Sequence, residues 1–307
     1  MNQGQTMSYH SNGKLLLSGE YLVLKGATAL SIPTKFGQSL VFAPIEETHF
    51  LWQSFDHLNR IWLEVIFDPS SLKIRSFNGD QEAATRLRDL LRIAFDLSDR
   101  NPSDLIGSSV STLLEFDKNW GLGTSSTLIN NVADWLDIDP YLLLQRTFGG
   151  SGYDIACARN NSALLYTLEQ SVPTIEKVSF KPSFSNHMYF VYLNQKQISR
   201  DSILKFEKQS TVSENQIRRV SEISRRLVVA NNLTEFSNSI VEHESILSDV
   251  LMVPPVKKRL FNDFDGEIKS LGAWGGDFVL ALSSSDPSAY FRNKGYETII
   301  AYDEMVL

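Results

Sequence analysis

Residues suited to hold a phosphate group gather in one short stretch near the middle of the chain. It consists of Gly121, Leu122, Gly123, Thr124, Ser125 and Ser126, which follow an alternating apolar run and precede residues with helical spacing. Glycines let the backbone come close to a ligand, and the free N–H groups and dipole at a helix start favour negative charge. Hydroxyl groups can ligate Mg²⁺ or donate to phosphate oxygens. The stretch predicts an anion site, with an ordinary glycine turn and a hydroxyl N-cap as the alternative.

This stretch differs from the two best-known phosphate-binding motifs. No Gly-Lys-Ser/Thr sequence follows the glycines, so it is not a Walker A loop. Ser126 stands where a dinucleotide-binding fingerprint needs its third glycine. Its chemistry therefore has to be inferred together with other segments of the chain.

A second glycine-rich segment ends in a carboxylate. Gly149, Gly150, Ser151 and Gly152 precede Tyr153 and Asp154. Four small residues would let a substrate come close to Asp154, which favours a functional role for this carboxylate. The alternative is an aspartate near a helix N-terminus, where the helix dipole stabilises it.

An early lysine and a late glycine loop complete the set of candidates. Lys14 lies on a largely apolar segment between Gly13 and Gly19, so its ammonium group must either reach solvent or meet a charge. The loop 272–276 lies between two apolar strands, which is also the pattern of a hairpin with a bulge. Each signal is weak by itself, so their order along the chain matters.

The surrounding patterns predict the elements that position these residues. Short apolar runs bounded by turn formers predict strands over 39–43, 50–55, 61–67, 72–77, 110–116, 164–168, 188–193, 268–271, 278–282 and 297–302. Helical spacing predicts helices over 80–97, 140–148, 202–209, 213–230, 233–251 and 255–261. We expect residues 1–10 to be frayed. Along the apolar stretch 14–24, the closely spaced Gly13, Gly19 and Gly26 favour strands and turns over a helix. Strands and helices alternate irregularly after early hairpins, which predicts the α+β class.

The composition indicates a soluble globular protein. The 307 residues are 42% hydrophobic, which is enough for a sizeable core in one large domain or two intimate ones. A net charge of -7 argues against nucleic-acid binding as the main role. The only cysteine, Cys157, excludes an intrachain disulfide, and no apolar run reaches membrane-spanning length. We expect a cytoplasmic protein with neither nucleic-acid nor membrane partners.

Taken in order, the four segments resemble the motifs of the GHMP kinases, the superfamily of galactokinase, homoserine kinase, mevalonate kinase and phosphomevalonate kinase. The segment 13–21 is similar to the first motif of this superfamily. The stretch 121–126 is similar to the second motif, usually Gly-Leu-Gly-Ser-Ser-Ala, and 269–278 is similar to the third. The resemblance spans most of the chain.

This resemblance implies a two-part fold, with a ribosomal-protein-S5-like part over 1–170 and a ferredoxin-like α+β part over 171–307. It implies that 121–126 bind the phosphates of ATP, that Ser125 ligates Mg²⁺, and that Lys14 and Asp154 are catalytic. The implied partner is a small anionic substrate, and a homodimer is left open. The residues expected to bind the substrate are Glu20, Tyr21, Ser151, Gly152, Lys196, Arg200, Gly272 and Gly275.

The combination of Lys14 and Asp154 is similar to the pattern of the mevalonate-pathway kinases. The expected reaction is transfer of the ATP γ-phosphate to mevalonate or phosphomevalonate in isoprenoid precursor synthesis. Tyr21 stands where mevalonate kinases usually carry histidine, and the sequence 150–156 resembles the Gly-Ser-Gly-Phe-Asp-Val-Ala of phosphomevalonate kinases. The sequence Gly-Tyr-Asp-Ile-Ala at 152–156 also resembles the corresponding sequence of a bacterial group of GHMP kinases.

Two departures from the family pattern keep alternatives open. Trp274 replaces a glycine of the third motif and could reshape the substrate pocket. Leu143 stands where mevalonate kinases carry a metal-binding glutamate, and Gln145 is the nearest polar candidate. The alternatives are a GHMP kinase for another small alcohol or sugar, a related decarboxylase, and a non-catalytic GHMP-like nucleotide-binding regulatory protein.

Overall fold

The computed structural model describes residues 5–170, 172–195, 206, 208, 211–272, 274 and 277–307, which form two compact units. Unit 1 consists of Met1–Gly13, Phe36–Lys118 and Gly123–Arg159, and unit 2 consists of Lys14–Lys35, Asn119–Leu122 and Asn160–Leu307. Strands β1 (Met7–Ser18) and β2 (Ala29–Pro44) each run through a unit boundary. Helices and sheets occur in both units, so the predicted α+β class is confirmed. The division into parts 1–170 and 171–307 stays a prediction.

Unit 1 contains a sheet with the strand order β5-β4-β3-β6-β2. Its strands are β3 (Phe50–Phe55), β4 (Ile61–Phe67), β5 (Ile74–Gly79), β6 (Ser108–Leu114) and the last part of β2. Strands β3, β4 and β5 pair antiparallel, β3 and β6 pair parallel, and residues 38–44 of β2 pair antiparallel with β6. Buried residues alternate with partly exposed ones along β3 and β6, so one face of this sheet builds the core.

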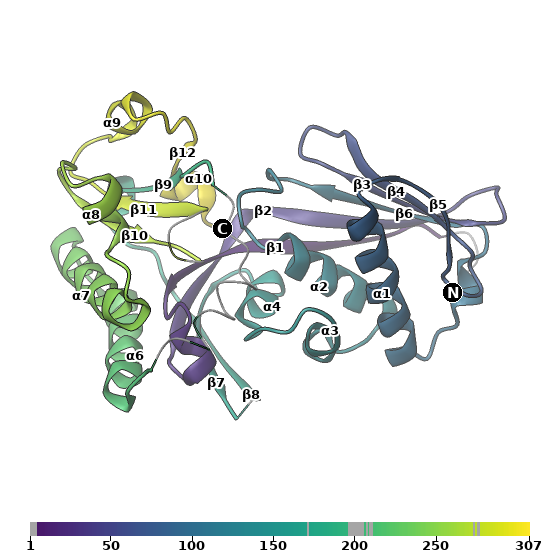
Figure 1. Cartoon of the computed structure of the whole chain (residues 1–307), viewed down its shortest axis with the longest axis horizontal. Helices are drawn as coiled ribbons and strands as arrows, with labels where there is room; N and C mark the ends of the chain where they lie inside the picture. Colours follow the sequence, from purple (N-terminus) through teal and green to yellow (C-terminus); the bar gives the residue numbers. More distant parts are fainter. Residues whose placement is uncertain are drawn as a thin grey trace. The chain divides into compact units, whose positions relative to one another are not determined.

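Helices α1 (Gln81–Leu97) and α2 (Thr124–Leu136) of unit 1 pack on this sheet, α3 (Pro140–Thr147) packs against both of them, and α4 (Tyr153–Ala158) packs against α2 (Figure 1). The 3-10 turn η2 (Pro102–Leu105) precedes β6. Asp80 and Asp139 cap α1 and α3 by accepting from backbone N–H groups of the first turn. The shared core contains Trp52, Val110, Leu91 and Trp135.

Unit 2 contains a hairpin that extends β2 and a separate antiparallel sheet. The hairpin consists of β7 (Ala163–Glu169) and β8 (Val172–Val178), and residues 29–31 of β2 pair with 164–166 of β7. The second sheet has the order β10-β11-β9-β12. Its strands are β9 (Met188–Tyr192), β10 (Glu267–Ser270), β11 (Phe278–Leu282) and β12 (Ile299–Ala301).

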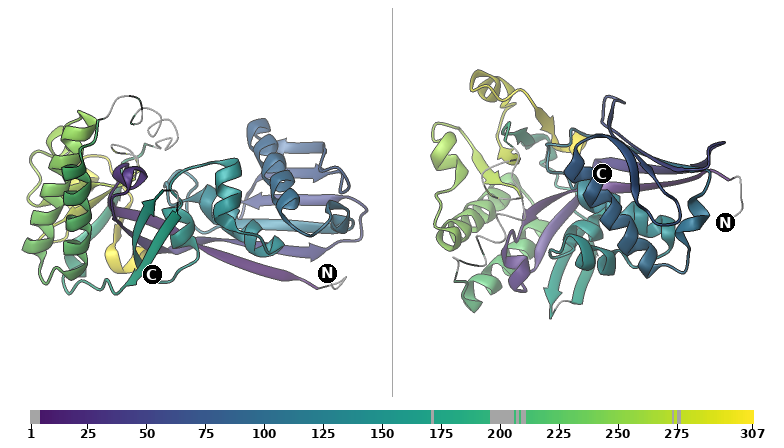
Figure 2. Two further views of the ribbon diagram at one scale, coloured as in Figure 1. Left: turned by 90° about the horizontal axis from the view of Figure 1, so that it is seen from below. Right: turned by 45° about the vertical axis from the view of Figure 1, so that its right-hand side comes forward.

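Two long helices of unit 2, α6 (Glu214–Val229) and α7 (Leu233–Leu251), lie side by side, and α7 contacts β10 (Figures 1 and 2). The shorter elements are η1 (Leu22–Lys25), η3 (Ser185–His187), α8 (Val256–Leu260), α9 (Ser288–Asn293) and α10 (Tyr302–Met305). Within the described ranges, no helix combines the length and apolar character needed to cross a membrane.

Local predictions near the start of the chain have different outcomes. Strands and turns were favoured over 14–24, and the structure has β1 up to Ser18 and the 3-10 turn η1 over Leu22–Lys25. The prediction of a frayed segment over 1–10 is wrong for Met7 to His10, which belong to β1. Strand β8 was not predicted. Of the helix predicted over 202–209, only Phe206 and Lys208 are described, and both are helical.

Candidate functional site

The start of α2 has the geometry of an anion site. Gly121 and Gly123 have φ angles of 68° and 98°, which glycine adopts at little cost. Gly123 is the N-cap residue of α2, and no side chain caps the amides that follow it. The first N–H groups of a helix have no intrahelical acceptor, so they can donate to a bound anion. Ser126 turns its hydroxyl back to the Gly123 carbonyl at 2.9 Å, whereas Ser125 is exposed.

A buried polar network in unit 1 fixes α2 behind this site. The Ser11 hydroxyl donates to Asn131 Oδ1 at 2.7 Å, and Asn131 Nδ2 donates to the Gln38 carbonyl at 2.9 Å. The Thr127 hydroxyl donates to Gln38 Oε1 at 2.7 Å, one turn closer to the helix start. Buried hydrogen bonds of this kind are costly to break, so they set the depth and rotation of α2 on the sheet.

Asp154 lies in the first turn of α4, and α4 contacts α2 within unit 1. Gly152, the N-cap residue, has a φ of 85°, and Ser151 precedes it. Asp154 is partly buried, and its Oδ1 accepts from the Ile155 N–H at 3.0 Å. Burial raises the pKa of Tyr141 to about 12, and the negative charge of Asp154 acts in the same direction. Unit 1 therefore brings the helix that carries Asp154 beside the helix that carries Ser125.

Lys14 contacts the first residues of the glycine stretch within unit 2. Its N–H donates to the Leu122 carbonyl at 2.9 Å, and its Nζ donates to the Gly121 carbonyl at 2.7 Å. On the other side of Gly121, a Cβ atom would lie 2.4 Å from Asp277 Oδ2, so only glycine fits there. The ammonium group predicted to act on the transferring phosphate is thus bonded to the chain just before α2.

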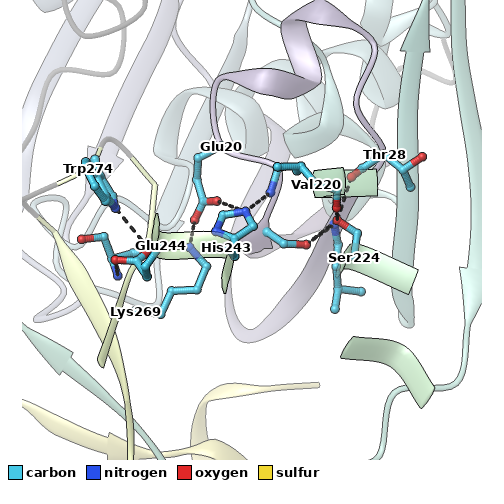
Figure 3. A network of polar contacts seen from close by, with 12 residues as sticks. Glu20, Thr28, Val220, Ser224, His243, Glu244, Lys269 and Trp274 are labelled. Atoms are coloured by element: carbon cyan, nitrogen blue, oxygen red, sulfur yellow. Dashed lines mark hydrogen bonds and ion pairs between the residues drawn. The ribbon is translucent and has the colours of Figure 1, made fainter. Parts of the chain in front are cut away.

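Glu20 belongs to a buried ionic network of unit 2 (Figure 3). Lys269 Nζ lies 2.6 Å from Glu20 Oε1 and 3.3 Å from Glu244 Oε1, and it also donates to the Ser270 carbonyl at 2.8 Å. Glu20 is 1% exposed and Lys269 is 0% exposed. Burial raises the pKa of Glu20 to about 7 against the opposing effect of Lys269, and it also raises the pKa of Glu244.

His243 is the neutral member of this network. Burial and the Lys269 charge lower its pKa well below the ordinary value, and its Nε2 accepts from the Gly19 N–H at 2.9 Å. The contact of 3.4 Å between this nitrogen and Glu20 Oε2 is therefore not an ion pair at neutral pH. Among the described residues, Glu20 Oε2 has no hydrogen-bond donor, which favours a proton on it.

The structure describes some of the remaining predicted site residues and not others. The Tyr21 ring contacts the ring of Phe206, and a Cβ atom on Gly272 would lie 3.7 Å from Asp277 Oδ2. Lys196, Arg200 and Gly275 lie outside the described residues. Substrate contacts by Glu20, Tyr21, Ser151, Gly152 and Gly272 stay predictions.

Glu244, His243 and the partner of Glu20 were not predicted from the sequence. One signal was present, because Lys269 stands between Ile268 and Leu271 in a segment predicted to be a strand, where a buried ammonium group would need a counter-charge. His243 and Glu244 also interrupt the buried side of a helix. Their partners are distant in sequence, so a local pattern could not pair them.

No family model and no curated protein matches this chain, whereas solved structures do. A Lin0012 protein from Listeria innocua shares 18% identity over 96% of this chain and 97% of its own, with a TM-score of 0.71. A phosphomevalonate kinase of Streptococcus pneumoniae, solved with phosphomevalonate and AMPPNP, shares 17% over 96% and 99%, with a TM-score of 0.68. The mevalonate kinase of Methanococcus jannaschii shares 15% over 95% of both chains, with a TM-score of 0.67.

The chain has the GHMP kinase fold. The two-part α+β fold implied by the motif resemblance is therefore confirmed. In this GHMP kinase fold, the stretch similar to the second motif is the turn into α2, and the segment similar to the third motif lies between β10 and β11.

The predicted magnesium ligand Ser125 is exposed at the start of α2, so its hydroxyl is accessible to an ion. Within the described part of the chain, no group of three or more His, Cys, Asp or Glu residues could hold a metal. Mg²⁺ usually takes only one or two protein ligands and completes its shell with phosphates and water. Ser125 presents an exposed hydroxyl for this purpose, whereas Leu143 is fully buried and Gln145 is exposed. Position 143 therefore supplies no metal ligand.

Proposed function

We propose that this chain is an ATP-dependent small-molecule kinase of the GHMP type that transfers the γ-phosphate to mevalonate or phosphomevalonate. The observation that carries the proposal is the uncapped start of α2, where Gly121 and Gly123 adopt positive φ angles and Ser125 is exposed. Within a GHMP kinase fold, this is the place where helix amides can hold the phosphates of a nucleotide.

The chain's own groups would act mainly by positioning and by neutralising charge, which is the main need of phosphoryl transfer. The N–H groups of Thr124, Ser125 and Ser126 would donate to phosphate oxygens. The Ser125 hydroxyl would ligate Mg²⁺, which would supply positive charge to the phosphates when bound. Lys14, already bonded to the Gly121 carbonyl, would place a further positive charge next to the phosphates.

The role of Asp154 depends on the acceptor. A hydroxyl acceptor such as that of mevalonate has to lose a proton, and Asp154 would take it as general base. A phosphate acceptor is already anionic, so Asp154 would then orient Lys14 instead. A phosphorylated substrate also needs additional cations, for which Lys196 and Arg200 are the candidates. A homodimer and a cytoplasmic location are part of the same proposal.

The second candidate is a non-catalytic GHMP-like nucleotide-binding protein. Leu143 favours it, because this buried side chain removes the metal-binding glutamate expected of a mevalonate kinase. The joint presence of Lys14, Ser125 and Asp154 favours the kinase, because binding alone has less need of all three. A kinase for a sugar or another small alcohol ranks below the mevalonate branch because of Lys14.

The deciding measurement is ADP release with mevalonate, phosphomevalonate and diphosphomevalonate tested side by side. We expect turnover with one of the first two and a loss of about a hundredfold or more in Lys14→Ala, because a charge next to the phosphates is removed. Lys25→Ala, an exposed lysine on η1, is the matched control and should keep wild-type activity. Nucleotide binding without ADP release for any acceptor would favour the non-catalytic protein, and turnover with diphosphomevalonate alone would favour the decarboxylase.

A further inference from the structure

Arg159, which directly follows α4 as its C-cap residue, joins α4 to α2 within unit 1. Its Nη1 donates to Asn130 Oδ1 and to Asp134 Oδ1, both at 2.9 Å. Asn130 and Asp134 are neighbours one turn apart on α2, so a single nitrogen binds two adjacent side chains of that helix. Helix α4 carries Asp154 and α2 carries Ser125, so this contact connects the two helices of the candidate site.

The Asn130 side chain links Arg159 to the buried network that fixes α2. Asn130 is 1% exposed, and its Nδ2 donates to Ser11 Oγ at 2.9 Å. The Ser11 hydroxyl in turn donates to Asn131, which is bonded to Gln38 of β2. Because the nitrogen of the Asn130 amide is bonded to Ser11, the amide oxygen is turned towards Arg159. One chain of hydrogen bonds therefore runs from the end of α4 through α2 to the sheet.

Helix α4 needs such a restraint because it is short and follows a glycine-rich segment. It has six residues, and a helix of this length depends on tertiary contacts. A Cβ atom on Gly149 or Gly150 would meet nothing within 4 Å, so the backbone before α4 is open at these positions. Ile155 anchors α4 in the core, but apolar packing is not directional, whereas hydrogen bonds have preferred angles. The bonds of Arg159 can therefore define how α4 is turned and shifted on α2.

The contact between Arg159 and Asp134 lies at the surface. The two side chains are 40% and 35% exposed. Exposed ion pairs contribute little to stability, and water can replace the lost partners when such a pair is removed. Replacing Arg159 should therefore leave the fold of unit 1 intact while it releases α4. An effect on the reaction would then report the placement of α4 and not a loss of folded protein.

We propose that Arg159 is a positioning residue for phosphoryl transfer, which holds α4 on α2 so that the Asp154 carboxylate meets the acceptor in a productive geometry. This inference rests on the kinase proposed above. Arg159 acts through Asp154, and a displacement of about 1 Å in a reacting group can cost about a hundredfold in rate. The general base and the partner of Lys14 are alternative roles of the same carboxylate, and both depend on where α4 places it.

The test begins with Arg159→Met, which removes both bonds and keeps a long side chain. ADP release is measured with whichever of mevalonate and phosphomevalonate loses more rate in Asp154→Asn. We expect kcat to fall by about tenfold or more with an unchanged KM for ATP, because the start of α2 is not altered. Arg159→Lys keeps a cationic nitrogen that can donate to both oxygens, so it should recover most of kcat.

Two further variants complete this comparison. Arg86→Met breaks an exposed ion pair within α1 of unit 1 and should keep wild-type rates. Calorimetric binding of ATP shows whether each variant is folded. If Arg159→Met does not fold, Asp134→Asn replaces it, because it weakens the same contact with almost no change of shape. The expected result is then a smaller fall in kcat, again with an unchanged KM for ATP.

The deciding comparison places Arg159→Met in the Asp154→Asn background. If Arg159 acts through Asp154, the double variant should be no slower than Asp154→Asn alone. A further loss as large as in the single variant would overturn the positioning role, and so would a wild-type kcat in Arg159→Met. A rise in KM for ATP that matches the loss of kcat would also overturn it, because unit 1 would then be loosened in general. The kinase stands in all three cases, whereas no ADP release by the wild type with either acceptor would overturn both proposals.

Discussion

Lys14 and Lys269 show how one sequence signal leads to two different roles. Both lysines stand among mostly buried residues of a strand, where an ammonium group needs a partner. Lys269 is fully buried between two carboxylates, so its charge is used within the protein. Lys14 is partly exposed and donates to a backbone carbonyl, so its charge can also act on a bound anion. The exposure of each lysine to solvent, and not its residue type, therefore distinguishes the structural Lys269 from the candidate catalytic Lys14.

Asp154→Asn distinguishes the two roles proposed for this carboxylate. An asparagine cannot accept the proton of a hydroxyl acceptor, so kcat with mevalonate should fall by about a hundredfold or more. With phosphomevalonate, whose acceptor oxygen is already ionised, the loss should be much smaller. Initial rates of ADP release at saturating ATP measure both values.

Asp96→Asn, an exposed aspartate on α1, is the control for the loss of one negative charge in unit 1. It should leave both rates unchanged. A rate with mevalonate in Asp154→Asn that stays close to the wild-type rate would exclude the general-base role.

At the scale of the element, α2 lacks the stabilisation that most helices have at their start. A serine, threonine or aspartate at the N-cap stabilises a helix by about 1 kcal/mol relative to alanine but by only a few tenths of that relative to glycine, so Gly123 leaves the amides uncapped at a small cost. Asp80 and Asp139 do supply such caps in α1 and α3. The network of Ser11, Gln38 and Asn131 holds α2 from behind instead. Its amides are therefore left for a ligand while the helix stays fixed.

Gly121→Ala tests whether the backbone before α2 has to approach Asp277 for nucleotide to bind. The new Cβ atom would lie 2.4 Å from Asp277 Oδ2, so the Asp277 carboxylate or the backbone at Gly121 has to shift. We expect the affinity for ATP, measured by calorimetry, to fall by about tenfold or more, because small displacements of binding groups are costly. Gly295→Ala has the same kind of strain, with a φ of 87° but no atom within 4 Å, and should bind ATP normally. Equal ATP affinity in the two variants would show that this contact does not shape the site.

Elements defined by their own local pattern could be predicted from the sequence. The bounds of β3, β4, β11 and α7 agree with the predicted ranges, because alternation or helical spacing marks these segments along their whole length. The position of the turn η1 within the apolar stretch could not be predicted, because no local pattern marks the positive φ of Tyr21. Strand β8 was missed because most of its side chains are exposed, so it lacks an alternating apolar pattern.

The residues of the candidate site were likewise predictable only where a local motif marks them. The glycine stretch, Lys14 and Asp154 could be recognised because each stands in a short motif whose order along the chain is informative. The pair of Glu20 and Lys269 joins residues that are 249 positions apart, and no local pattern records such a partner. Trp274 was noticed only as a departure from a glycine motif, and its contact with Glu244 required the fold.

At the scale of the whole molecule, the buried network ties distant parts of unit 2 together. Glu20 follows β1, His243 and Glu244 belong to α7, and Lys269 belongs to β10. Glu20 and His243 should affect the pH dependence of folding in opposite directions. The pKa of His243 is lowered in the folded state, so its contribution to stability is lost as the pH falls below about 6.5, where the unfolded imidazole gains a proton.

The pKa of Glu20 is raised from 4.5 to about 7, so the folded protein holds this proton more tightly than the unfolded chain does. Its contribution to stability is present below pH 4.5 and is lost as the pH rises through about 7. Glu20→Gln cannot titrate and resembles the protonated acid. Between about pH 4.5 and pH 8, the free energy of unfolding of the wild type should therefore fall relative to this variant by up to about 3 kcal/mol.

Urea denaturation of both proteins at several pH values measures this difference, and His243 cancels from it because both proteins contain the same imidazole. Glu244 and Lys269 also face Glu20, so the shift should be smaller if Glu244 takes over the shared proton in the variant. Glu222→Gln, an exposed glutamate on α6, should show no pH-dependent difference from the wild type. Parallel stability curves for the wild type and Glu20→Gln would mean that Glu20 is ionised in the folded protein throughout this range.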